Sequence, residues 1–96
     1  MKDNIIELEY DKLVTNLTGN KLGRAEFKKQ IEPKLDYTKL NVIVFPEQIE
    51  DVGMSFFQGL YQEIINKFGK NDIESHFQIK SSHIELVEKF NKIISL

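Results

Sequence analysis

The chain has 96 residues, 13 basic and 15 acidic side chains, a net charge of −2 and no cysteine. This length predicts one domain spanning residues 1–96, and an acidic balance disfavours nucleic acid as a partner. The lack of cysteine excludes disulfides and thiolate chemistry. No apolar run is long enough to span a membrane, and charges come too early for a signal peptide. We therefore expect a cytoplasmic protein with no membrane partner.

The first third of the chain predicts a strand followed by a helix. Apolar residues alternate with glutamates, which is typical of a strand with one buried face: Ile6, Leu8 and Tyr10. Residues 13 and 14 are compatible with the end of a second strand, and residues 16–20 predict a turn. A helix is predicted over residues 23–35, with Pro33 ending or distorting its last turn.

The middle of the chain carries the clearest pattern. Residues 42–45 are apolar without alternation, which predicts a central strand in a parallel sheet covered by helices on both faces. Pro46 ends this strand, and an acidic turn follows over residues 47–51. In the helix that follows, Gly59 either permits close packing of the helix on the sheet or is a helix-weakening residue without a role. Gly69 suits the left-handed position after that helix. The helix carries a wide apolar stripe: Phe56, Phe57, Leu60, Tyr61, Ile64, Ile65 and Phe68.

The last quarter predicts one helical turn over residues 71–75, a short strand over residues 77–79, and a final helix. Ser82 and Glu85 have the spacing of a capping box at the start of that helix. Its inward face is predicted to hold Ile84, Val87, Phe90 and Ile94, with Leu86 and Ile93 flanking that face. Alternating strands and helices predict an α/β fold, a single small domain with a mixed sheet of three to five strands and three main helices. Right-handed crossovers should place the helices.

Residues 40–94 resemble the STAS-like domains of unknown function found in bacteria and phages. The shared order is an apolar strand, an acidic loop, a Ser-Phe pair that opens a helix (here Ser55 and Phe56), a Phe-Gly helix end, a short strand and a terminal helix. Upstream, residues 22–24 with Phe27 are similar to the first helix of that family. The resemblance implies a STAS-like fold and a protein-binding role.

The wider STAS superfamily includes anti-anti-sigma factors, which bind a kinase-like partner and are switched by serine phosphorylation at the start of the corresponding helix. The matching window here is residues 53–58, in which Ser55 is the hydroxyl residue. Gly53 and Met54 stand where that motif has an acidic residue and a hydroxyl. The resemblance therefore implies a partner-binding fold more than a phosphorylation switch.

Ser55 has two further interpretations from its position alone. It can satisfy free backbone N–H groups at the helix start. As a candidate phosphorylation site, it would place a phosphate where the helix dipole favours it and the neighbouring carboxylates oppose it. We predict a partner-binding site at Glu50, Asp51, Gly53, Met54, Ser55 and Phe56. An exposed Phe56 or Phe57 would be the best anchor in that site, because aromatic residues carry much of the energy of interfaces.

The remaining motifs do not indicate a functional site. His76 and His83 lack the spacing of a metal site and are interpreted as surface residues. Residues 17–24 contain two glycines before a helix but not the pattern of a phosphate-binding loop. We find no nucleophile elbow, and we expect no catalytic residue, metal or cofactor.

The leading hypothesis is a non-enzymatic STAS-like regulatory module that binds a protein partner, such as an ATPase or kinase-like regulator, through residues 50–57. The alternative is a small immunity protein or antitoxin that neutralises a toxin through an acidic face at Glu47, Glu50 and Asp51. Binding of that second kind would weaken with added salt.

Overall fold

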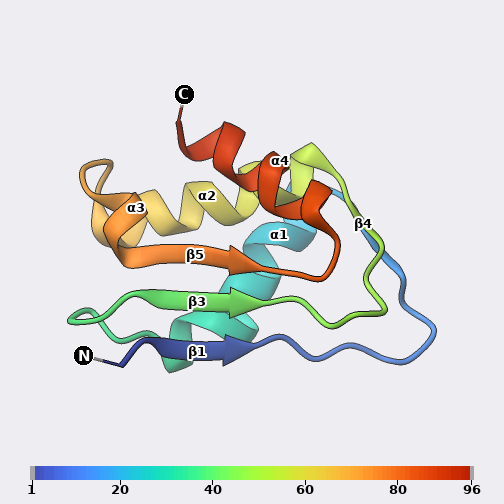
Figure 1. Cartoon of the computed structure of the whole chain (residues 1–96). Coiled ribbons are helices and arrows are strands. Elements are labelled where there is room, and N and C mark those ends of the chain that lie inside the picture. Colours follow the sequence, from blue (N-terminus) through green and yellow to red (C-terminus); the bar gives the residue numbers. More distant parts are fainter. Residues whose placement is uncertain (1, 96) are drawn as a thin grey trace.

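The centre of the molecule is a parallel sheet of three strands in the order β1-β3-β5, shown in Figure 1. This computed structural model describes residues 2–95. The strand predicted to be central, β3, lies between the other two. The bounds are β1 (Asn4–Glu7), β3 (Asn41–Val44) and β5 (Phe77–Lys80).

Two very short strands form a separate parallel pair, β2 (Asn16–Leu17) with β4 (Asp51–Val52). Both sheets are purely parallel, where one mixed sheet was predicted. The turn predicted at residues 16–20 is wrong, and no second strand forms at residues 13 and 14. Leu17 pairs with Val52 instead, and both side chains are buried in the core. A strand of two residues has no periodicity that a sequence pattern could reveal.

The helices confirm the α/β class of this compact single domain. The first helix begins at Asn20, three residues earlier than predicted. It continues as a π-helical turn and ends as a 3-10 turn, which contains Pro33. Gly69 has a φ of 77° and ends the longest helix, as predicted. Within residues 2–95 no helix is long and apolar enough to cross a membrane. The helical elements are α1 (Asn20–Glu26), the π-helical turn η1 (Phe27–Ile31), the 3-10 turn η2 (Glu32–Lys34), α2 (Met54–Phe68), α3 (Ile73–His76) and α4 (Ile84–Ile94).

The sheet has one covered face and one open face. Because β1, β3 and β5 follow one another in a single direction, right-handed crossovers place α1 and α2 on the same side of the sheet. In Figure 1, α1 passes behind the strands and α2 lies above β5. On the open face, Val42 lies between Ile5 and Gln78, and Ile5 is 53% exposed. The strand is buried on both faces as predicted, since Val42 is only 5% exposed. The prediction of helices on both faces is wrong, because Val42 is flanked by its strand neighbours and lies outside the main core cluster. The covered face carries a row of buried isoleucines: Ile6, Ile43 and Ile79.

An aromatic cluster joins the helices to the sheet. The ring of Phe57 lies 5.9 Å from that of Phe45 and 5.7 Å from that of Phe90, measured between ring centroids. Phe56 and Phe57 are both fully buried. The apolar stripe predicted for α2 therefore forms the centre of the core.

The helix α4 begins differently from the prediction. His83 precedes its first turn, and the His83 N–H donates to Ser81 Oγ at 3.0 Å, while the capping box of Ser82 and Glu85 does not form. The inward face is also rotated relative to the prediction: Ile84 is 62% exposed, whereas Val87 and Ile94 are partly buried against the core. The residues that α4 buries are Leu86, Phe90 and Ile93.

Two glycines let α1 and α2 cross in close contact. A Cβ atom added to Gly59 would overlap the backbone carbonyl of Asn20, and one added to Gly23 would overlap that of Phe56. Gly59 therefore permits close packing of helix on helix, where packing of helix on sheet was predicted. This crossing places the start of α2 beside the start of α1.

Candidate functional site

The starts of α1, α2 and α4 lie at the end of the domain where the strands of the main sheet finish, on the right of Figure 1. This follows from the parallel topology, in which every connection leaves a strand at its carboxyl end. The β2–β4 pair lies at this end too, and it leads directly into α1 through Gly19 and into α2 through Gly53. The predicted site is therefore located where two helices begin together.

Ser55 links these two helix starts. Its Oγ accepts the backbone N–H of Gly19 at 3.2 Å, and the residue remains exposed. Gly53, in extended conformation, precedes the first turn of α2, so Ser55 is the second residue of the helix. The interpretation of Ser55 as a cap of its own helix is corrected, because its Oγ instead satisfies the N–H of the residue that precedes α1.

Met54 and Ser55 are the exposed part of the predicted site. Met54 is 40% exposed, whereas Phe56 is 1% and Phe57 0% exposed. The prediction that Phe56 belongs to the partner-binding surface is wrong, because its ring is buried in the core. The exposure that would have made either phenylalanine an anchor is not found. We call the surface formed by Thr18, Gly19, Gly53, Met54 and Ser55 the helix-start surface.

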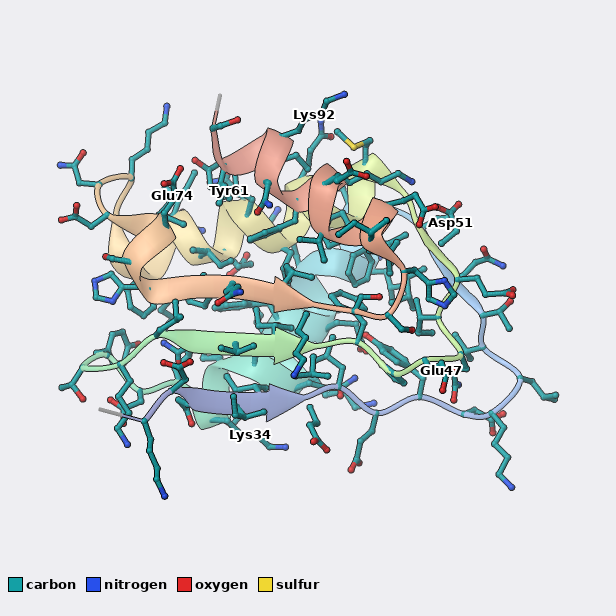
Figure 2. All side chains as sticks on the ribbon, viewed as in Figure 1. Lys34, Glu47, Asp51, Tyr61, Glu74 and Lys92 are labelled. Carbon is teal, nitrogen blue, oxygen red and sulfur yellow. The ribbon has the colours of Figure 1, made fainter. Side chains whose placement is uncertain are left out.

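The acidic residues beside this surface divide into paired and unpaired groups. Lys89 Nζ lies 2.9 Å from Asp51 Oδ1 and also donates to the Val52 carbonyl oxygen at 2.9 Å. Glu47 and Glu50 are exposed and have no ion-pair partner within residues 2–95. Figure 2 shows Glu47 and Asp51 on the same side of the molecule, along the loop and strand that lead to α2.

The Lys89 ammonium changes the acidity of Asp51. The hydrogen bond from Lys89, together with its positive charge, holds the pKa of the Asp51 carboxyl below its ordinary value of 3.8. We expect the Lys89→Met variant to raise that pKa back toward the ordinary value, as measured by an NMR titration of the side-chain carbon. Because the folded-state pKa is depressed, this pair stabilises the fold above the ordinary pKa, and the contribution is lost as the pH falls through the folded pKa.

The matched control for that titration is Lys92→Met, which removes an exposed lysine of the same helix that has no ion pair within residues 2–95. An unchanged pKa for Asp51 in the Lys89→Met variant would contradict the assigned contact.

A second polar cluster closes the end of β1. Gln30 accepts the Glu9 N–H at 2.7 Å and donates through Nε2 to the Glu9 carbonyl oxygen at 3.1 Å and to Glu26 Oε1 at 2.7 Å. Burial, and then the nearby Glu26 carboxylate, raise the pKa of the Tyr10 phenol above its ordinary value. An ordinary tyrosine is already protonated at neutral pH, and this shift makes the Tyr10 phenol a still weaker acid.

The two histidines have structural contacts. His83 Nε2 lies 2.9 Å from the carbonyl oxygen of Glu47, and the ring of His76 lies 5.2 Å from that of Phe68. Both side chains are partly exposed, which is compatible with the interpretation of both as surface residues. No group of three histidine, aspartate or glutamate residues in the described part of the chain could hold a metal ion.

The segment over residues 17–24 also has a structural role. Gly19 has a φ of 99° at the turn into α1, and Gly23 lies in the helix crossing. Sequence reasoning did not place Gly19 or Thr18 in the site, because the contact between Gly19 and Ser55 joins residues 36 positions apart. The only local signal was a glycine before a helix.

Comparison with known proteins found no matching protein-family model, curated protein or solved structure.

Proposed function

We propose that this protein is a non-enzymatic, cytoplasmic interaction module of STAS-like type that binds a protein partner through the helix-start surface. The observation that supports the proposal is the exposure of Met54 beside Ser55, whose Oγ holds the starts of α1 and α2 together. Methionine is enriched in protein interfaces. A surface that is already ordered loses less conformational entropy on binding.

The helix-start surface is held in place by the core beneath it. Phe56 and Phe57 follow Met54 directly and are buried, so the backbone of the first turn cannot rotate to hide the methionine. Gly59, in the next turn of α2, lets the Asn20 backbone pack closely against the helix, and Gly23 does the same for the Phe56 backbone. Met54 is therefore presented to solvent from a rigid base.

Ser55 is the proposed regulatory position on this surface. A phosphate there would lie in the first turn of α2, where the helix dipole favours negative charge. The opposition from carboxylates is smaller than the sequence suggests, because Lys89 pairs with Asp51 and leaves Glu50 as the exposed acid nearest in sequence. Phosphorylation would also change the group that accepts the Gly19 N–H.

The direct test is photo-crosslinking in cells that make the protein, with benzoylphenylalanine in place of Met54. We expect a discrete adduct with one protein of the ATPase or kinase-like class. The matched control replaces Tyr37, which is 55% exposed and lies in the connection before β3, at the opposite end of the strands. Identical adducts from positions 54 and 37 would contradict the proposal.

The partner identified in this way allows the affinity to be measured. We expect Met54→Glu to weaken binding by about tenfold or more, because it places a charge in the centre of the contact. Ser55→Asp should weaken binding more than Ser55→Ala does if phosphorylation releases the partner, because alanine removes only the hydrogen bond to the Gly19 N–H. Tyr37→Glu should leave the affinity unchanged. Calorimetric titration measures all four variants, and equal affinities for wild type and Met54→Glu would exclude the helix-start surface.

A second candidate function is supported by the unpaired acids. Glu47 and Glu50 are exposed without ion pairs in the described residues, which suits an immunity protein or antitoxin that covers a basic toxin surface. In that case the double variant Glu47→Lys and Glu50→Lys would reduce binding and its salt dependence, whereas Met54→Glu would change little. The two proposals thus predict opposite rankings of the same variants.

A further inference from the structure

The strand β1 has a free edge. The Asn4 N–H donates to the Leu40 carbonyl at 2.8 Å and the Leu8 N–H to the Val44 carbonyl at 2.9 Å, so the even-numbered residues of β1 face β3. Alternation along the strand directs the N–H and C=O groups of Ile5 and Glu7 to the other side. Within residues 2–95 these groups have no backbone partner, and Figure 1 shows no strand beyond β1.

The free edge is short and held at both ends. At its start, Asn4 Nδ2 donates to the Lys34 carbonyl oxygen at 2.7 Å and to Asn41 Oδ1 at 2.7 Å. At its end, Gln30 binds both backbone groups of Glu9. The free hydrogen-bonding groups thus lie between these fixed points, on a backbone that is already extended.

The side chains along this edge are acidic. Asp3, Glu7 and Glu9 are exposed, and they surround Ile5, which is 53% exposed on the open face of the sheet. Figure 2 shows Lys34 as a basic residue near β1. The outer edge of β1 therefore presents three carboxylates, the apolar side chain of Ile5, and unpaired backbone N–H and C=O groups.

A second copy of the chain does not suit this edge. Antiparallel pairing of two such edges must match outward-facing residues with one another. The register that brings the two copies of Ile5 together sets each Glu7 against the Asp3 of the other copy. Like charges directly opposite each other destabilise a strand pair. The neighbouring registers place Ile5 opposite Asp3 or Glu7 of the other copy, so that its side chain has no apolar partner.

We propose that the outer edge of β1 binds an extended basic segment of a partner protein as an added strand. The segment has the pattern basic, any, β-branched apolar, any, basic, which sets its two cations opposite Asp3 and Glu7 and its apolar residue opposite Ile5. The backbone hydrogen bonds supply affinity, and alternate side chains supply specificity. The pattern is the same in both directions, so it suits parallel and antiparallel addition alike.

The test uses a synthetic peptide, Thr-Lys-Thr-Val-Thr-Lys-Thr with blocked ends, titrated into the ¹⁵N-labelled protein. We expect the amide resonances of Ile5 and Glu7 to shift more than those of Asn4 and Ile6, whose N–H groups already face β3. A control peptide with glutamate in place of both lysines should leave these resonances unmoved.

Two protein variants test the two parts of the recognition. Ile5→Pro removes one outward N–H without touching the ladder to β3, and it should raise the dissociation constant about threefold or more. The double variant Asp3→Lys and Glu7→Lys should raise it about fivefold or more and should admit the glutamate peptide. Glu88→Lys, which reverses an exposed acid on α4, should leave the affinity unchanged.

Three results would overturn the proposal. The first is an absence of shifts at Ile5 and Glu7 at millimolar peptide. The second is equal binding of the lysine and glutamate peptides. The third is concentration-dependent dimerisation that shifts these same amides without any peptide, which would assign the edge to a second copy.

Discussion

Replacing Asn41 with leucine should lower the free energy of unfolding by about 3 kcal/mol, although the two side chains are similar in size. Asn41 is fully buried in β3. Its Oδ1 accepts the Asn4 side-chain amide at 2.7 Å and the Asp36 N–H at 2.9 Å. Its Nδ2 lies within hydrogen-bond distance of the carbonyl oxygens of Asp36, Lys39 and His76, at 2.9, 3.2 and 3.2 Å.

The cost arises because one amide serves all three strands of the main sheet. Its partners are in β1, in the loop before β3 and in the residue just before β5. Leucine would leave buried donors and acceptors without partners, and each such group costs about 1–3 kcal/mol. Networks of this kind lose more than one bond when their central member is removed.

Urea denaturation measures the effect, with Asn66→Leu as the control at an exposed position of α2. The control should change the stability by less than about 0.5 kcal/mol.

The Asn41→Asp variant distinguishes the contribution of the Oδ1 acceptor from that of the Nδ2 donor. It keeps an accepting oxygen but places a second oxygen, in place of Nδ2, beside three carbonyl oxygens. We expect that variant to lose stability as the pH rises and the carboxyl ionises. A leucine variant as stable as the wild type would show that the network contributes nothing.

Gly59→Ala should lower the free energy of unfolding by about 2 kcal/mol, although alanine is the better helix former by about 1 kcal/mol. The sign is reversed because the added methyl group would overlap the Asn20 carbonyl oxygen at the helix crossing. Neither helix can yield easily, since Phe56 and Phe57 fix α2 in the core. Separation of the helices would also lengthen the contact between Ser55 and Gly19.

Thermal unfolding, together with the exchange rate of the Gly19 amide, measures both consequences. The control is Gln58→Ala, one residue earlier and exposed, where the substitution should be neutral or slightly stabilising. A stabilised Gly59→Ala variant would mean that α1 and α2 are not in close contact.

Local pattern was sufficient for the long elements. The apolar run at β3, the wide stripe of α2 and the glycine that ends it each depend on residues close in sequence, so their prediction was confirmed. The α4 stripe was rotated in the prediction because Ile84 and Leu86 differ little in apolarity. The packing of α4 against the core decides which of them faces inward.

The site was only partly predictable for a related reason. Residues 50–57 do lie at the carboxyl end of the sheet, and Met54 and Ser55 are exposed there. Phe56 was assigned both to the apolar stripe of the helix and to the partner-binding surface, and the structure buries it in the core. The role of Ser55 depends on Gly19, and that of Asp51 depends on Lys89.

The sequence by itself determined the α/β class, the central strand, the long amphipathic helix and the acidic balance, because these properties add up along the chain. Tertiary structure alone decided that the helices share one face, that the glycines join helix to helix, and that β1 keeps an open acidic edge. Those features depend on contacts between residues 33 to 39 positions apart, from Gly23 with Phe56 to Gly59 with Asn20. Their energy comes from packing and from hydrogen bonds that exist only after the chain has folded back on itself.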